Sequence, residues 1–223
     1  MVLNAPEANE PVDDHVYQFD FQQGWIDLTL EKLDWVDAWA VATVVESTQF
    51  DSAKLAVKTR TLTRDLRKRA LVLNGNESNL AAAYYTPEGR AVADFRLDTY
   101  SEEETPRPSP AEVAPLLSRI SDAEVVGEPD VRYLDLAVGP AVRVRADVKN
   151  KRSRLGFSRG WTGGLIKYAV FPPRLDSLSV VSVRWWNPQD AAEATRLTDG
   201  LATTMKLVPA DADEDEAERN TGS

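Results

Sequence analysis

Residues 141–149 read Ala-Val-Arg-Val-Arg-Ala-Asp-Val-Lys, in which apolar and charged side chains alternate from Val142 onward. Successive side chains of a β-strand point to opposite faces, so this period of two predicts a strand with one buried face. The residues expected to face the core are Val142, Val144, Ala146 and Val148, and those expected to face outward are Arg143, Arg145, Asp147 and Lys149.

Neighbouring stretches extend this strand into a sheet. Residues 131–137, 165–171 and 178–186 also have strand character, and Gly139-Pro140 and Pro172-Pro173 provide links between them. Short links join antiparallel neighbours. Further upstream, residues 80–100 predict two strands around a turn at 86–89, and residues 17–30 predict a hairpin or a bent strand.

Helical spacing in two early stretches predicts two helices. Residues 33–45 carry Trp35, Trp39 and Ala42 at helical intervals, which predicts a buried helix. Residues 51–73 predict a helix with an exposed basic face, which ends at Asn74-Gly75. Its apolar stripe is expected to consist of Leu55, Thr59, Leu62, Leu66 and Leu73.

Two more helices are predicted from their start signals. Ser109 and Glu112 form a capping box that begins a helix running to about residue 121. Asn187-Pro188 begins the last helix, whose apolar stripe is Ala194, Leu197, Leu201 and Met205. The fold class is therefore α+β, an antiparallel sheet of six or more strands with helices packed on it.

The composition excludes several kinds of chemistry, and the two ends of the sequence set the limits of the predicted domain. The 223 residues include no Cys and one His, which excludes thiolate chemistry and predicts neither a cofactor nor a metal site. No apolar run approaches the roughly 20 residues that cross a bilayer, so we expect a soluble cytoplasmic protein with no membrane partner. Residues 1–14 and the acidic residues 210–223 are expected to be disordered tails of a single domain, 15–209.

Charge is segregated along the chain. The net charge is −10, yet residues 51–75 sum to +5 and residues 142–174 sum to +8. Such basic islands either pair with acidic segments of the same molecule or form local sites for anionic partners.

One basic segment is the strongest candidate for a binding site. Residues 149–161 interleave basic and aromatic side chains, a combination that attracts anions and stacks on rings. The candidate contact residues are Lys149, Lys151, Arg152, Arg154, Phe157, Arg159 and Trp161. They favour an acidic protein partner; nucleic acid or another anionic ligand, bound with the help of helix 51–73, is the alternative. A hairpin tip kept soluble by its charges would have the same composition.

Paired carboxylates give the one enzymatic alternative. Asp94 and Asp98 share a face of the second strand of 80–100, and Arg96 lies between them. This spacing predicts a solvated ladder of charges. A deep pocket lined by both carboxylates would favour hydrolytic chemistry instead. Because nothing in the sequence indicates that they are buried, we predict that the protein is not an enzyme.

The order of these elements resembles the PsbP-like fold family, which includes extrinsic photosystem subunits, Ran-binding import factors and LpqN-type bacterial proteins. The resemblance rests on Phe21–Leu28, on the paired strands 141–149 and 165–171, and on Val180–Pro188 with its following helix. It covers about half of the chain. It implies α/β/α layers and a scaffold that acts by contacting other proteins, without shared catalytic residues.

Overall fold

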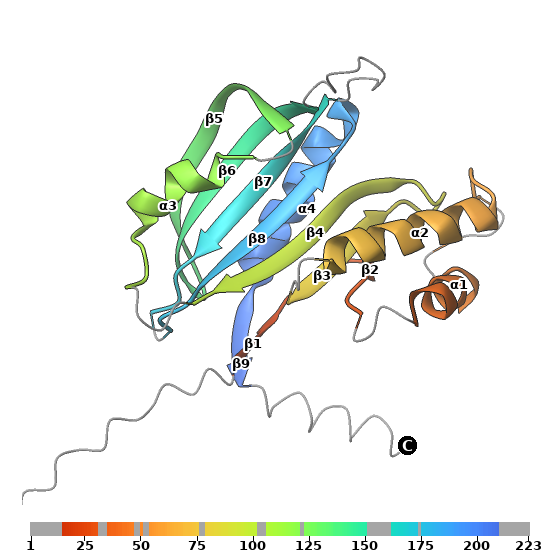
Figure 1. Cartoon of the computed structure of the whole chain (residues 1–223), viewed down its shortest axis with the longest axis horizontal. Helices are drawn as coiled ribbons and strands as arrows, with labels where there is room; N and C mark the ends of the chain where they lie inside the picture. The colour runs from red at the N-terminus through yellow and green to blue at the C-terminus, as the bar shows by residue number, and fades with distance from the viewer. Residues whose placement is uncertain are drawn as a thin grey trace, which may run out of the picture.

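A seven-stranded antiparallel sheet forms the centre of the computed structural model, with strand order β2-β3-β4-β8-β7-β6-β5 (Figure 1). The structure describes residues 15–30, 35–46, 50, 54–75, 79–101, 106–120, 123–150, 162–173 and 175–209. The strands are β2 (Trp25–Asp27), β3 (Leu80–Tyr85), β4 (Ala91–Tyr100), β5 (Ala123–Leu136), β6 (Gly139–Asn150), β7 (Thr162–Val170) and β8 (Leu178–Trp185). With four α-helices among the described residues, the predicted α+β class is confirmed.

A separate two-stranded ribbon joins the two ends of the described chain. Strand β1 (His15–Gln18) pairs with β9 (Lys206–Pro209), with Val16 opposite Val208. The predicted hairpin within residues 17–30 is therefore wrong. Phe19 and Phe21 instead pack their rings edge-on against Phe95 of β4, at centroid distances of 5.2 and 5.4 Å. This aromatic packing draws the chain across the sheet before β2 begins.

Helix α4 (Ala191–Thr204) covers one face of the sheet (Figure 1). The expected apolar stripe of Ala194, Leu197, Leu201 and Met205 is buried in the largest core cluster, as predicted. Arg143 was expected to face solvent but is buried beneath this helix. Its guanidinium donates to the Asp199 carboxylate at 3.0 Å and to the Tyr168 hydroxyl at 3.2 Å, which offsets the cost of burial.

The opposite face carries α2 (Thr59–Asn74) and α3 (Pro110–Leu117), and α1 (Val36–Glu46) packs beside α2, as Figure 1 shows. The predicted helix of residues 33–45 is observed as α1, which buries Val36, Ala40 and Val44. Trp39 packs partly buried against the same cluster as predicted, whereas Trp35, just before the helix, is 58% exposed and was predicted wrongly. Helix α2 begins at Thr59, eight residues later than predicted, and buries Leu62, Leu66 and Ala70. None of the helices in these described ranges is long and apolar enough to cross a membrane.

Candidate functional site

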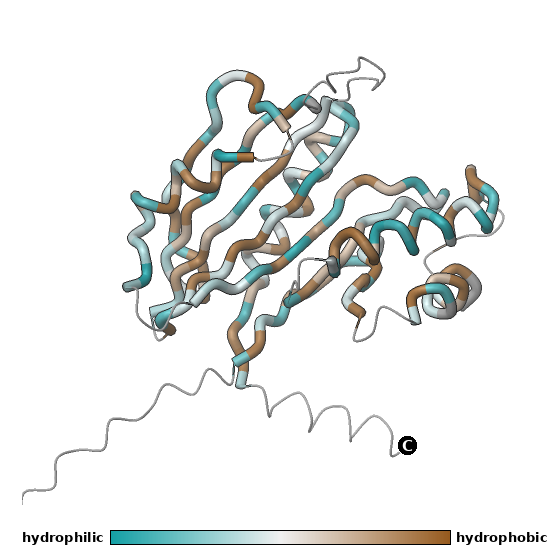
Figure 2. Tube along the Cα trace, viewed as in Figure 1, coloured by the Kyte–Doolittle hydropathy of each residue, from teal (hydrophilic) through white to brown (hydrophobic). Residues whose placement is uncertain are grey.

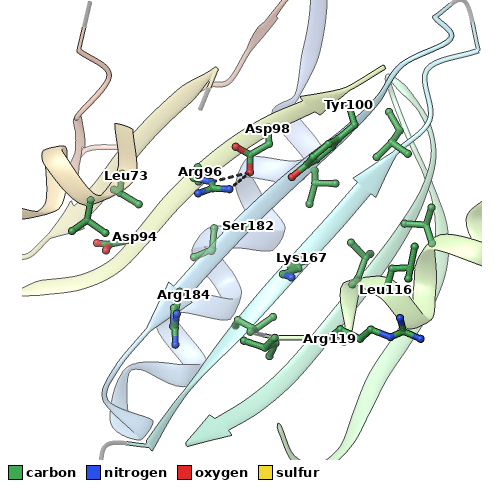
Figure 3. Close-up of a pocket in the computed structure, with 18 of the residues that line it drawn as sticks. Leu73, Asp94, Arg96, Asp98, Tyr100, Leu116, Arg119, Lys167, Ser182 and Arg184 are labelled. Carbon is green, nitrogen blue, oxygen red and sulfur yellow. Dashed lines mark hydrogen bonds and ion pairs between the residues drawn. The ribbon is translucent and has the colours of Figure 1, made fainter. Parts of the chain in front are cut away.

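A groove of about 750 Å³ opens on this second face, between helices α2 and α3 (Figure 3). Its floor is formed by β4, β8 and β7. Figure 2 shows that hydrophilic and hydrophobic positions follow one another along these strands. A volume of this size lies within the range of sites that hold small ligands or the anchor of a partner.

The strand register arranges the floor side chains in rows. Asp94 of β4 lies opposite Arg184 of β8. In the next row, Arg96 lies opposite Ser182, which in turn lies opposite Lys167 of β7. Figure 3 shows Ser182 between the three basic side chains. The floor therefore carries cations around one hydroxyl group, and its two acidic side chains, Asp94 and Asp98, both come from β4.

The two carboxylates of β4 line this groove and are buried, so the predicted solvated ladder is wrong. Asp94 and Asp98 are each 8% exposed. Each is paired with an arginine: Arg69 Nη1 donates to Asp94 at 2.5 Å, and Arg96 Nε donates to Asp98 at 2.8 Å. Burial raises the pKa of Asp94 to about 6, and the charge of Arg69 opposes this rise.

Arg69 links the groove to the core beneath α2. Its Nε donates to Asp65 at 2.8 Å, and the Tyr85 hydroxyl donates to the same carboxylate oxygen at 2.7 Å. Its guanidinium carbon lies 4.8 Å from the centroid of the Trp186 ring. Burial raises the pKa of the Tyr85 phenol, so Tyr85 stays a hydrogen-bond donor. These contacts connect α2 to the strands beside the groove.

Exposed apolar side chains surround the groove. Val72 of α2, Tyr100 of β4 and Leu116 of α3 are 62%, 54% and 51% exposed. Single exposed apolar residues are ordinary, but three that border one hollow form a patch of the kind found at binding sites. We call Val72, Tyr100 and Leu116 the apolar rim.

Helix α3 forms the second wall and is held by polar contacts. The predicted capping box is confirmed, with the Ser109 N–H donating to Glu112 at 2.8 Å. Before the helix, Arg107 Nη1 donates to the carbonyl oxygens of Pro172 and Leu175, at 2.8 and 2.6 Å. Val113 and Leu117 pack on the sheet. The helix ends at Leu117, four residues earlier than predicted.

Among the residues predicted from sequence for the binding site, the structure describes Lys149. It lies near the end of β6, opposite Thr162 of β7, and its ammonium group lies 3.0 Å from the Glu124 carboxylate. The other predicted contact residues, Lys151, Arg152, Arg154, Phe157, Arg159 and Trp161, lie outside the described residues. Lys149 lies on the same face of the sheet as Arg145, and neither Lys149 nor Thr162 lines the groove.

Sequence reasoning missed Lys167, Ser182 and Arg184. A signal was present, because polar residues alternate with apolar ones at these positions of two predicted strands. Without the register between β4, β8 and β7, nothing indicated that they share a floor with Asp94 and Arg96. No group of three His, Asp or Glu side chains in the described part of the chain is arranged to hold a metal ion.

Comparison with known proteins adds little to this description. No protein-family model and no curated protein matches the sequence. Among solved structures, the chain is similar to the Saccharomyces cerevisiae Ran-binding protein Mog1p, with 9% identity and a TM-score of 0.34 over 60% of this chain and 80% of that one. A TM-score of this size carries no argument. Membership of the PsbP-like fold family therefore stays a prediction.

Proposed function

We propose that this chain is a non-enzymatic protein-binding module and that the groove between α2 and α3 is its principal contact site. The observation that carries this proposal is the combination of a hollow of about 750 Å³ with an exposed apolar rim. Exposed apolar side chains around a hollow are typical of surfaces that a partner covers. The groove also lies between secondary-structure elements that the core holds in place.

The carboxylates do not support the enzymatic alternative, although both line the groove. Asp94 and Asp98 are four residues apart on one strand, which separates their Cα atoms by about 13 Å. Carboxylates that share hydrolytic work lie within roughly 10 Å of each other. Here Arg96 lies between them and pairs with Asp98, while Arg69 pairs with Asp94. Both carboxylates thus serve as counter-ions of arginines.

The basic segment 149–161 is proposed as an extension of the same contact surface. The segment connects β6 with β7, and β7 supplies Leu165 and Lys167 to the lining of the groove. The candidate residues Arg152, Arg154 and Arg159 would then attract an acidic partner toward the groove. Nucleic acid is the alternative partner for this segment. Its binding would weaken steeply with salt because displaced counter-ions drive it.

Affinity capture with matched variants tests the proposed contact site. Leu116→Glu places a charge on the apolar rim, and Val41→Glu on α1 is its control because Val41 has a similar exposure, 53% against 51%. We expect proteins captured by the native chain and by Val41→Glu to be lost with Leu116→Glu. Equal capture by all three forms would exclude the groove as a contact site.

A second comparison tests the basic segment. A chain with Gln at positions 152, 154 and 159 is expected to capture less of the same protein without a change in melting temperature, since these charges act through the solvent. Protein and nucleic acid are both measured in the eluate. Unchanged capture would exclude the segment, and loss of nucleic acid alone would assign it to nucleic-acid binding.

A further inference from the structure

Basic side chains outnumber acidic ones in the described lining of the groove, although the protein as a whole is acidic. Its described lining includes four basic side chains, Arg96, Arg119, Lys167 and Arg184, and two acidic ones, Asp94 and Asp98. The whole chain has a net charge of −10. The local potential of a hollow follows the charges that line it, since its low-dielectric walls concentrate their field. Charge complementarity therefore favours an anionic group in the groove.

The register fixes where such an anion would lie. Arg96 and Lys167 are both in register with Ser182, one strand away on either side. Neighbouring strands are about 4.8 Å apart, so the Cα atoms of the two cations are about 10 Å apart across the serine. Their long side chains can meet above the Ser182 hydroxyl. Asp98 accepts from two nitrogens of the Arg96 guanidinium, which carries five N–H groups.

The apolar rim restricts what can carry this anion. Val72, Tyr100 and Leu116 are each more than half exposed around the charged floor. A free inorganic anion would bind to the floor but would leave the side chains of the apolar rim exposed to water. A nucleic-acid backbone presents phosphates at regular intervals and would meet Asp94 and Asp98 as well as the cations. A protein segment with one carboxylate between apolar side chains satisfies the floor and the rim together.

We infer that the groove holds a segment of a protein partner in which one Asp or Glu is flanked by apolar residues. The carboxylate accepts hydrogen bonds from Arg96, Ser182 and Lys167, and the flanking side chains cover Val72, Tyr100 and Leu116. This inference rests on the proposed function and specifies the chemistry of the partner. A carboxylate enclosed in this way is the central anchor of the interface, and the rim excludes water from it.

Selection of peptides from a random dodecapeptide display library, with the full chain as bait, tests the inference. The expected consensus has Asp or Glu between apolar residues. The selected peptide is then measured by fluorescence polarisation, together with a version in which its acid is replaced by the matching amide. We expect that version to bind about tenfold more weakly, the effect of losing one charged hydrogen-bonded contact.

Variants of the floor provide the matched comparison. Lys167→Gln and Ser182→Ala are expected to lower the affinity for the peptide. For Lys167→Gln we expect a loss of about tenfold. Arg145→Gln is the control, because Arg145 lies on the opposite face of the sheet and pairs with Asp147. It should leave affinity within about twofold of the native value. Melting temperatures identify any variant that fails to fold. If Lys167→Gln fails to fold, Ser182→Ala provides the comparison in its place.

The outcomes separate the inference from the proposed function. Peptides that lose binding with Leu116→Glu but lack an acid, or that bind Lys167→Gln normally, would overturn the inference and leave the groove as a contact site. Absence of any selected peptide that depends on Leu116 would overturn both. In a third outcome no peptide is selected, but the chain binds a single-stranded dodecanucleotide and Lys167→Gln abolishes this binding. The occupant of the groove would then be nucleic acid and not a protein segment.

Discussion

Arg69 is the residue whose removal should affect stability most clearly. Its guanidinium and the Asp94 carboxylate are both largely buried, with side-chain exposures of 18% and 10%. Replacing Arg69 by Met leaves that carboxylate buried without its nearest counter-ion. We expect the free energy of unfolding at pH 7.5 to fall by about 3 kcal/mol, the usual cost of breaking a buried pair. Urea denaturation measures this loss.

The pH dependence of the same variant tests the cause. Burial already raises the pKa of Asp94 to about 6, and loss of Arg69 raises it further. A carboxyl whose pKa is higher in the folded state makes stability fall as pH rises from the unfolded pKa to the folded one. The loss in Arg69→Met should therefore be smaller at pH 5 than at pH 7.5. An equal loss at both pH values would contradict this explanation. Arg64→Met, at an exposed position of α2, is the control.

At the scale of elements, Arg107 is expected to contribute to the position of helix α3, together with the packing of Val113 and Leu117 on the sheet. The helix has eight residues, too few to be stable alone, and Arg107 ties the chain before it to the segment 172–177. Arg107→Met removes charge-assisted hydrogen bonds to three carbonyl groups. We expect a loss of about 2 kcal/mol and faster amide exchange in α3. Amide exchange in α4, on the other face of the sheet, should become faster only to the extent that the free energy of global unfolding falls.

The same comparison has a functional readout. Helix α3 supplies Leu116 and one wall of the groove. A less firmly held α3 should therefore lower the affinity for the selected peptide, even under conditions in which the variant is fully folded. Normal affinity together with faster exchange in α3 would show that the position of this wall is unimportant for binding. Arg132→Gln on β5 is a suitable control, since Arg132 is 65% exposed and pairs with Asp130.

Elements could be predicted from local patterns, but their partners could not. Alternation predicted β6, and the capping box predicted the start of α3, because both signals lie within a few consecutive residues. The aromatic residues near Phe19 carry the same alternation, yet β1 pairs with β9. That choice depends on a contact nearly two hundred residues distant in sequence. Trp35 was misassigned for a related reason, since the covered side of α1 is decided by α2 and β3.

The candidate site shows the same limit. The face shared by Asp94, Arg96 and Asp98 could be predicted from the period of two. Their burial depends on the two helices that rise on either side of them and on Arg69, which comes from α2 to neutralise Asp94. Arg143 is the parallel case on the other face, where Asp199 of α4 makes burial of a charge tolerable. Long-range counter-ions of this kind leave no local signature in a sequence.

At the scale of the whole molecule, the segment inferred for the groove is acidic, and so is the chain that would bind it. Residues 210–223 contain six acidic residues and one basic residue, so removing them changes the net charge from −10 to −5. Two molecules of like charge repel each other, and this repulsion slows their association. Salt screens the repulsion. Deleting 210–223 should therefore speed association of the selected acidic peptide by roughly threefold at about 10 mM salt, where the Debye length is about 30 Å.

The salt dependence separates this long-range effect from a contact. In about 1 M salt the Debye length falls to about 3 Å, and the native and shortened chains should then associate at the same rate. The dissociation rate, which reflects contacts in the groove, should be unchanged at either salt concentration. Stopped-flow fluorescence measures both rates. Faster association that persists in 1 M salt would instead indicate that residues 210–223 cover the groove directly and compete with the peptide for Arg96 and Lys167.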